Sequence, residues 1–408
     1  MKQSFKHLST KYAGLMGSYN LGYAGFTGFG TVYLLSKGLN ESQIGLAVAL
    51  ANLLAVFVQP VLAERIDRSR RWTLLEYKLA LLIPLFFTML AMLIANQLMW
   101  LIAVLFVLAM TLMMILMPLL NSVAMYFINH GYQLDYGVPR AIGSAFYAVG
   151  ALIIGRLTVA YGTDAMVAFA IASFVIYSLV LFFFPFHQAR DRAADQAPDH
   201  QDHIATPADV TDLPDAEPFF KKYRQYGYFL AGVLCFITFH NLVNNYMFQI
   251  LVNVGGGQEH MGTAFALAAF IEVPVMVSYA WLSRRFSLRQ LLMTSAIFFL
   301  VKAIITAFAT GVPGIMLAQA TQMLAFGIYT TVSVYYTNTV MAKQDMVKGQ
   351  AMLATAQTIG NVLGSLVGGM IINHFSTQMA LYFCIICCIF GLFGFYKGVK
   401  RPSLQVAE

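Results

Sequence analysis

Apolar stretches of 20 or more residues recur along the whole chain, and they restrict the fold more than any other feature. A helix of about 20 apolar residues crosses a hydrocarbon layer of about 30 Å, where its backbone hydrogen bonds must all be made internally. The chain is 59% hydrophobic and only 11% charged, whereas about a quarter of the residues in soluble domains are charged. The sequence therefore predicts an all-α membrane protein with many spanning helices.

The apolar stretches predict twelve transmembrane helices joined by short gaps, with one long polar gap after the sixth. The expected spans lie near residues 11–36, 43–65, 73–95, 98–128, 139–160, 164–186, 223–252, 260–283, 289–310, 313–341, 347–373 and 377–397.

Positive charge gathers on one side of these spans. Twenty of the 25 Lys and Arg residues lie at the N-terminus, the C-terminus and the even-numbered gaps, and Lys37 is alone on the opposite side. Because Lys and Arg mark the cytoplasmic side, we expect both termini to be cytoplasmic in a bacterial-type plasma membrane. This bias also accounts for the net charge of +7, so no nucleic-acid partner is expected.

The chain also repeats itself at an offset of 217 positions. Matching residues lead up to a short basic turn in each half, among them Gly45 with Gly262, Leu50 with Leu267, Ala63 with Ala280 and Arg68 with Arg285. Such a repeat indicates two related bundles. We predict a six-helix bundle over 1–186, a cytoplasmic linker over 187–222 and a second six-helix bundle over 223–408.

No metal site or cofactor is predicted. The linker is rich in Asp, Pro and Ala and has no apolar periodicity, which is typical of a disordered tether. Three histidines beside its acids offer a metal site as the alternative reading (His187, His200 and His203). The four cysteines lie in apolar segments without acidic or His companions, which favours packing (Cys235, Cys384, Cys387 and Cys388).

The first basic turn resembles a motif of the major facilitator superfamily. Ala63-x-x-x-Asp67-Arg68, followed by Arg70-Arg71, is similar to the superfamily's loop after the second helix. It departs from that motif by having Ala in place of the usual Gly and by being about one residue short. The resemblance implies a gating role for Asp67, Arg68 and Arg71, and for Arg284 and Arg285 in the repeated turn. Alternatively, these charges only mark the cytoplasmic side.

A second segment resembles the lactose permease-like proton symporters, and the similarity extends over essentially the whole chain. Residues 135–147, DYGVPRAIGSAFY, are similar to the permease segment that enters the fifth helix. The resemblance implies that Arg140 binds sugar hydroxyls, that Tyr147 stacks on the sugar ring, and that the protein works as a monomer. Arg140 and Tyr147 are seven residues apart and so share one helix face, and a guanidinium suits vicinal hydroxyls or a carboxylate.

Further substrate ligands are expected on other helices. The first span has a cavity-type stripe of Tyr19, Asn20, Tyr23 and Phe26, and the amides of the second half are further candidates (Asn244, Asn245, Gln322, Gln357 and Asn361). Asn121 lies where the permeases have a sugar-binding acid. The tenth span has Gln319, Gln322 and Ala325 where the permeases have a basic residue, a histidine and an acid.

Three of the ionisable residues within predicted spans, where charge is costly and usually functional, are candidates for proton coupling. Glu272 matches a permease glutamate that touches both sugar and proton, and Lys302 matches an arginine that assists deprotonation. A structural salt bridge between the two is the alternative. His240, whose type titrates near neutral pH when unperturbed, is a further candidate for proton coupling.

These features predict a secondary transporter, in which two bundles rock around a midplane site and protons are the coupling ion. Uptake of a sugar or oligosaccharide is favoured. The alternatives are uptake of a small aromatic carboxylate or nucleoside, drug/proton antiport, and a non-transporting sensor or scaffold. An enzyme is not expected, because the sequence has no cluster of nucleophile, base or metal ligands.

Overall fold

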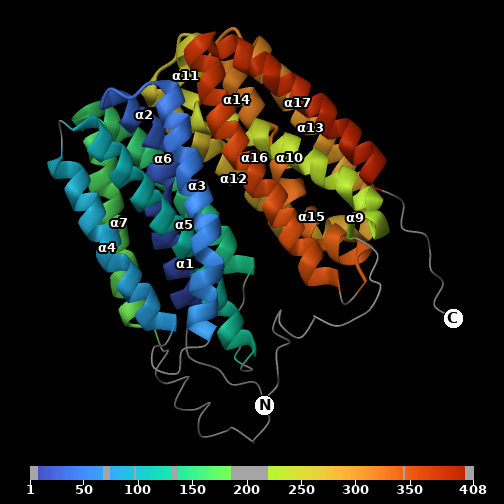
Figure 1. Cartoon of the computed structure of the whole chain (residues 1–408), viewed down its shortest axis with the longest axis horizontal. Coiled ribbons are helices and arrows are strands. Elements are labelled where there is room, and N and C mark those ends of the chain that lie inside the picture. The colour runs from blue at the N-terminus through green and yellow to red at the C-terminus, as the bar shows by residue number, and fades with distance from the viewer. Residues whose placement is uncertain are drawn as a thin grey trace, which may run out of the picture.

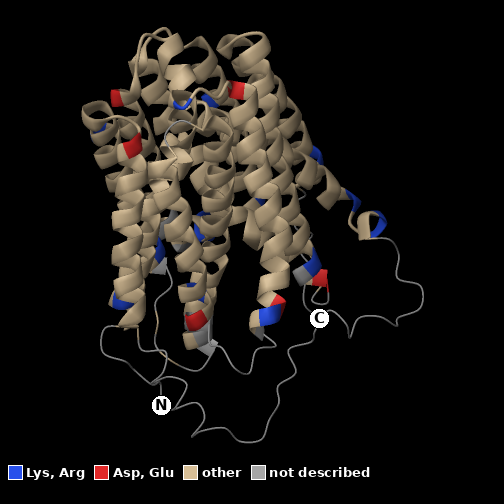
Figure 2. Cartoon of the chain, turned by 60° about the vertical axis from the view of Figure 1, so that its left-hand side comes forward, with Lys and Arg blue, Asp and Glu red and all other residues tan. Residues whose placement is uncertain are grey.

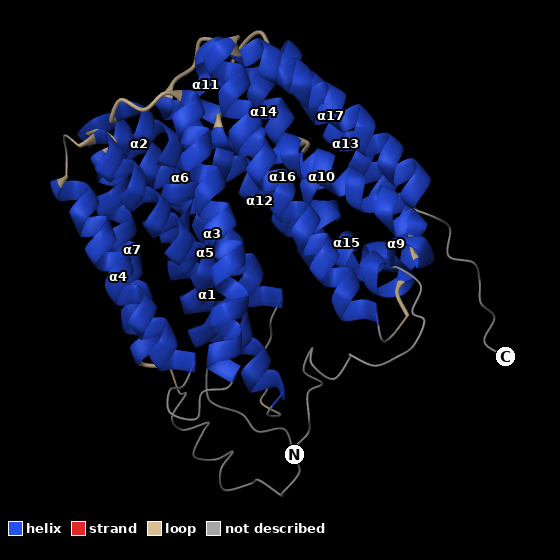
Figure 3. Ribbon diagram, in the orientation of Figure 1, coloured by secondary structure: helices blue, strands red, loops and turns tan. Residues whose placement is uncertain are grey.

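The structure is a computed structural model that describes residues 8–67, 74–95, 98–129, 132, 134, 137–184, 219–342 and 345–399. Helices make up nearly all of the described part, and no strand occurs in it (Figure 3).

The first half of the chain forms one bundle. Its elements are α1 (Leu8–Ala24), the π-helix η1 (Gly25–Phe29), α2 (Gly30–Ser36), α3 (Glu41–Asp67), α4 (Leu74–Ile94), α5 (Met99–Asn129), α6 (Gly137–Tyr161) and α7 (Asp164–Phe182). The elements α1, η1 and α2 follow one another without a gap, so a single rod with one wider turn takes the place of the first predicted span.

The second half forms another bundle. It consists of α9 (Phe219–Lys222), α10 (Arg224–Asn245), α11 (Met247–Asn253), α12 (Gln258–Arg285), α13 (Leu288–Phe308), α14 (Val312–Ala320), the π-helix η3 (Met323–Gly327), α15 (Ile328–Val340), α16 (Met346–His374) and α17 (Thr377–Gly398). The seventh predicted span is interrupted at Tyr246, and the tenth contains the π-helical turn.

The helices confirm a multi-pass membrane protein of the predicted fold class. Over the described residues, ten helices are long and apolar enough to cross a membrane. The order and bounds of the elements are consistent with the twelve predicted spans. Between its two ends the molecule is nearly free of charged residues (Figure 2), as the cost of charge in hydrocarbon requires.

The two bundles meet at one end and diverge toward the other (Figure 1). They touch along two seams, where α3 packs on α16 and α6 packs on α12. In Figure 1, α2 and α11 lie where the two bundles meet, which we call the closed end. The first turns of α1, together with the helices α9 and α15, lie at the opposite end, which we call the open end.

Glycines bring the helix backbones into contact at the closed end. A β-carbon on Gly262 would lie 2.6 Å from the Ala151 carbonyl oxygen, and one on Gly155 would lie 3.1 Å from the Gly262 Cα. On the other seam, a β-carbon on Gly45 would collide with the Ser365 carbonyl oxygen. Gly45 and Gly262 are the pair related by the sequence repeat, so the two seams are built alike.

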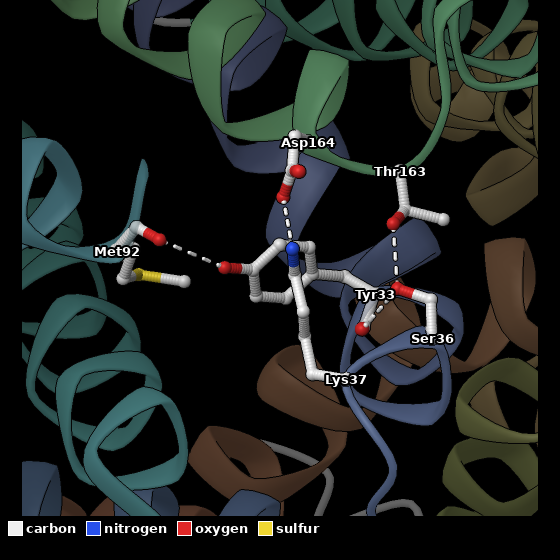
Figure 4. A network of polar contacts seen from close by, with 6 residues as sticks. All are labelled: Tyr33, Ser36, Lys37, Met92, Thr163 and Asp164. Carbon is white, nitrogen blue, oxygen red and sulfur yellow. Dashed lines mark hydrogen bonds and ion pairs between the residues drawn. The ribbon is translucent and has the colours of Figure 1, made fainter. Parts of the chain in front are cut away.

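A polar network braces the first bundle at the closed end (Figure 4). Lys37, the cation that stands alone on its side of the sequence, forms an ion pair of 2.7 Å with Asp164 and lies 5.3 Å from the Tyr33 ring centroid. The hydroxyls of Ser36 and Thr163 are 2.6 Å apart. These contacts tie the end of α2 to the start of α7.

At the open end, a contact between charged groups fastens the start of the second bundle to the turn before α16. Asp345 accepts hydrogen bonds from Lys222 Nζ at 2.7 Å and from the Tyr223 hydroxyl at 2.6 Å. These two donors hold the pKa of Asp345 below its usual range. The contact therefore persists at neutral and mildly acidic pH, and is lost only as the pH falls through that lowered pKa.

Of the predicted gating residues, Asp67, Arg284 and Arg285 lie at this open end. Asp67 ends α3, but its side chain, together with Arg68 and Arg71, lies outside the described residues. Arg284 and Arg285 end α12 and are exposed. Arg285 stacks over the Trp281 ring at 5.0 Å. Among the described residues, no hydrogen bond or ion pair joins these arginines to the first bundle, and their gating role stays a prediction.

Substituting either seam glycine should hinder closure. Gly45→Ala and Gly262→Ala each force a β-carbon onto a backbone oxygen, and overpacking of this kind costs about 1–3 kcal/mol. We expect the population that is closed at this end to fall about tenfold relative to the population open there. Spin-label distances between positions 40 and 253 on opposite bundles should lengthen. Gly227→Ala, whose β-carbon would lie 3.6 Å from the Phe220 side chain, should change nothing.

Candidate substrate site

A cavity of about 580 Å³ lies between the two bundles. It is lined by α1, η1, α3, α5 and α6 of the first bundle, and by α10, α12, η3, α15 and α16 of the second. The volume falls within the range of about 300–1,000 Å³ that is typical of small-molecule sites. The seams close one end of the space between the bundles, so the cavity is continuous with the diverging end.

The wall of the first bundle carries a cation and a set of hydroxyls. Arg140 lies in the first turn of α6 and is exposed, and Tyr147 lies two turns further along the same face. The Tyr147 hydroxyl is 3.2 Å from that of Thr27. Thr27 in turn donates to the Tyr23 carbonyl oxygen at 2.8 Å, so Tyr147 is the donor to Thr27. Asn20 lines the same wall and donates to the Met16 carbonyl oxygen at 2.8 Å.

Amide side chains dominate the wall of the second bundle. They come from α10, from the residue that precedes η3 and from α16, and include six residues (Asn241, Asn244, Asn245, Gln322, Gln357 and Asn361). Asn241 hydrogen bonds to Asn361. Gln357 donates to the Tyr329 hydroxyl at 2.8 Å, and Asn245 donates to the Ser365 hydroxyl at 2.9 Å. Their mutual hydrogen bonds hold these groups in position at the cavity surface.

One amide joins the two opposite charges of this wall. Gln322 Nε2 donates to Glu272 Oε1 at 2.9 Å, and the oxygen of the same amide accepts from Lys302 Nζ. Lys302, only 1% exposed, also donates to Gln319 Oε1 at 2.9 Å. The predicted alternative of a direct Glu272–Lys302 salt bridge is not what the structure contains, because Gln322 lies between the two groups. Glu272 lines the cavity, whereas Lys302 lies behind the wall.

His240 lines the cavity between an aromatic ring and an amide. Its ring stacks on that of Phe326 with centroids 3.9 Å apart and planes within 5°. Its Nε2 lies 2.9 Å from Asn244 Nδ2. Because the amide nitrogen is a donor, Nε2 is the acceptor and the imidazole is neutral in this arrangement.

The sequence repeat relates one wall of the cavity to the other. Seven pairs of lining residues are separated by 217 positions: Asn20 and Ile237, Tyr23 and His240, Thr27 and Asn244, Val48 and Phe265, Asn52 and Ala269, Arg140 and Gln357, and Ser144 and Asn361. The duplicated bundles therefore present equivalent positions to a common space, and those positions carry different chemistry in each half.

Four of the predicted site residues lie outside the lining. Tyr19 is buried in the first bundle, where its hydroxyl donates to the Met113 carbonyl oxygen at 2.8 Å. Phe26 stacks on Phe106 at 5.5 Å within the same bundle. Asn121 lies late in α5 and is half-buried away from the cavity. Lys302 reaches the site only through Gln322.

The sequence interpretation missed several lining residues. Asn52, Thr27 and Ser144 are polar, and Phe265, Phe326 and Tyr329 are aromatic. The repeat offset could have found two of them, since Thr27 and Ser144 are the equivalents of the predicted residues Asn244 and Asn361. The repeat could not have found Asn52, because the residue 217 positions later is the apolar Ala269.

The two bundles and the polar cavity between them define a membrane transporter for a small molecule. A family model described as "MFS_1 like family" matches residues 14–383. The chain belongs to this family of the major facilitator superfamily, which confirms the resemblance inferred from the two motifs.

Known relatives agree with this assignment. A maltose permease of Geobacillus stearothermophilus is 26% identical over 385 residues, covering 93% of this chain and 91% of that protein. Among solved structures, the nucleoside transporter NupG has a TM-score of 0.80 at 13% identity, covering 96% of this chain and 100% of that one. An auto-inhibited POT family peptide transporter has a TM-score of 0.70 at 10% identity, covering 99% of each chain. At these identities the structural similarities concern the fold alone.

The cavity should be reachable from one side only. With the native cysteines replaced by serine, Ser144→Cys on the cavity wall should react with a membrane-impermeant thiol reagent at least about tenfold faster from the open end, because the joined seams exclude it from the other. Right-side-out and inside-out vesicles measure the two rates. Ser173→Cys, which would be buried within the first bundle, should react from neither side. Equal rates for position 144 from both sides would contradict the closed seams.

Proposed function

We propose that the protein takes up a sugar or oligosaccharide together with protons, by alternating access in a bacterial-type plasma membrane. The main observation in support of this proposal is the environment of the Glu272 carboxyl group. It is the acid of the cavity wall, and it is held by one neutral amide among hydroxyl and amide groups that suit a polyol.

The chemistry of the cavity supports a sugar as the substrate. Amides and tyrosine hydroxyls donate and accept hydrogen bonds, as sugar hydroxyls require. Arg140 offers a fork of donors to adjacent hydroxyls, and Tyr147 presents an aromatic ring two turns away on the same face. The relative described as a maltose permease supports the same class of substrate.

The position of Glu272 supports coupling to protons. It borders the cavity and can exchange a proton with the water there, while Lys302 is sealed behind Gln322. When Glu272 is ionised, Gln322 and Lys302 stabilise its charge; when it is protonated, the carboxyl can donate to a substrate hydroxyl. The charge state of one carboxyl would then link proton and sugar. His240, neutral and hydrogen bonded, fits a substrate ligand better than a second proton carrier.

Uptake of an aromatic carboxylate or a nucleoside, and drug/proton antiport, are the competing functions. A carboxylate would place its charge on Arg140, and the aromatic rings of the cavity would accept a base or a phenyl group. The experiment below includes these compounds so that each function has its own outcome.

Proton coupling can be tested by external pH in de-energised cells. Adding the correct sugar, with maltose first in a panel of sugars, nucleosides and aromatic acids, should make an unbuffered suspension more alkaline. Glu272→Gln should abolish this change and reduce accumulation to equal concentrations inside and outside. Exchange of internal for external sugar should survive, because it needs no net proton movement.

Two variants provide matched controls for this experiment. Glu259→Gln alters an exposed glutamate of the same helix, and Asp345→Asn alters the acid whose lowered pKa keeps it ionised over this pH range. Both should retain the pH response. Sugar entry with no pH change would refute proton coupling through Glu272. A pH response only to aromatic acids or nucleosides would refute a sugar as the substrate.

The role of the paired N–H donors of the Arg140 guanidinium can be tested by a conservative substitution. Arg140→Lys keeps the charge but loses the paired donors. We expect the apparent affinity for sugar to fall by about tenfold, as loss of a hydrogen bond from a charged group implies. Radiolabelled sugar binding measures it, and Arg156→Lys, on an exposed part of the same helix, is the control. Unchanged affinity would remove Arg140 from the site.

A further inference from the structure

Two long rods depart from regular α-helix at residues related by the sequence repeat. In the first, the π-helical turn η1 ends at Phe29, whose backbone has φ −110° and ψ −2°. In the second, α10 gives way to α11 at Tyr246, with φ −110° and ψ 25°. The two residues are 217 positions apart, the offset that also relates Gly45 to Gly262. The duplication therefore preserves an aromatic residue at an irregular position in each rod, at the end of the π-helical turn in the first and between α10 and α11 in the second.

Phe29 fills the seam between α6 and α12. It is 1% exposed, and its ring meets that of Phe265 on α12 edge-on, with centroids 6.2 Å apart. The tip of the ring is 3.5 Å from the place of a β-carbon on Gly155. Phe29 belongs to the first bundle and Phe265 to the second, so the contact crosses the seam through apolar groups alone.

Tyr246 fills the opposite seam, between α3 and α16. It is 0% exposed. Its single hydroxyl proton is shared between two acceptors, the Ser365 carbonyl oxygen of its own bundle at 2.7 Å and, more weakly, the Glu41 carbonyl oxygen of the other bundle at 3.3 Å.

Glycines form the slot that holds this phenol. A β-carbon on Gly45 would lie 2.7 Å from the hydroxyl, and one on Gly368 would lie 3.0 Å from the ring. Any side chain at these positions would displace the Tyr246 ring. The close packing of this seam therefore serves the aromatic side chain as well as the two backbones.

Both aromatic residues directly follow residues of the cavity. Thr27, which accepts the Tyr147 hydrogen bond, lies two positions before Phe29. Asn244 and Asn245, which line the second wall, immediately precede Tyr246. One short segment of each helix thus touches both the substrate space and the closed end.

We propose that Phe29 and Tyr246 are a matched pair of gating residues, which insert into the two seams when this end is closed and leave them when it opens. The Tyr246 hydroxyl makes its seam a polar latch, whereas Phe29 holds the other seam by apolar contact. A ligand that shifts the segments carrying Thr27 and Asn244 acts on both gates at once. The proposal depends on alternating access only, and not on the identity of the substrate or on protons.

Removing one hydroxyl tests the latch without removing the ring. In the cysteine-replaced protein that carries Ser144→Cys, Tyr246→Phe should raise the rate of thiol modification from the closed end about fivefold, the effect of one buried hydrogen bond. Modification from the open end should fall slightly or stay constant. Tyr226→Phe is the matched control, because its hydroxyl is also buried in α10 but donates to the Gly349 carbonyl oxygen at 2.8 Å within the same bundle.

The apolar gate has its own pair of variants. Phe29→Leu should also raise modification from the closed end, by several-fold, because a smaller side chain leaves the seam underfilled. Phe26→Leu, three residues earlier and packed within the first bundle, should not. The proposal is overturned if Tyr246→Phe and Phe29→Leu react like their parent. It is also overturned if the control variants rise equally, since that would indicate general loosening.

Discussion

Direct contact between the backbones of the two bundles is the constraint on which the rest of the structure depends. At Gly45 and Gly262 no side chain separates α3 from α16 or α6 from α12, so the bundles are held at their closest approach at one end. The bundles diverge toward the other end (Figure 1), and the cavity lies between them. Because packed interfaces are bistable, the two seams can part and re-form as units rather than deform gradually.

The electrostatics of the cavity depend on a single amide. A direct pair between Glu272 and Lys302 would be expensive to desolvate and strongly destabilising to break. Gln322 instead satisfies one charge with its N–H and the other with its oxygen, and Gln319 supplies Lys302 with a further acceptor. Either group can then gain or lose a proton while the other keeps a hydrogen-bond partner. This arrangement suits the proposed proton cycle, in which Glu272 must gain and lose a proton once per turnover.

The sequence predicted the fold well because hydropathy and charge asymmetry report directly on the membrane. Among the predicted ligands that line the cavity, Asn20 follows from the spacing of the first span, whereas Arg140 and Asn361 follow from the resemblance to the permeases. The wrong assignments come from the rotation of each helix about its axis and from the depth of each residue in the membrane, neither of which composition encodes. Tyr19 and Phe26 share a stripe with Asn20 and Tyr23, yet Tyr19 turns toward α5 and Phe26 packs on Phe106. The π-helical turn that ends at Phe29 contains Gly25 and Gly28 and is followed by Gly30, whereas no proline or glycine adjoins Tyr246.

The duplication explains how one cavity can carry two different chemistries. Positions 217 apart still face the same space, but Arg140 is matched by Gln357, Ser144 by Asn361 and Thr27 by Asn244. The first bundle thus presents a fixed cation and hydroxyls, whereas the second presents amides and a carboxyl. A neutral substrate that hydrogen bonds to both walls draws the bundles together, and a small anion would sit against Arg140 alone. On this argument, a molecule long enough to reach both walls is the one best able to drive the rocking motion, and a polyol of one or more rings meets that requirement.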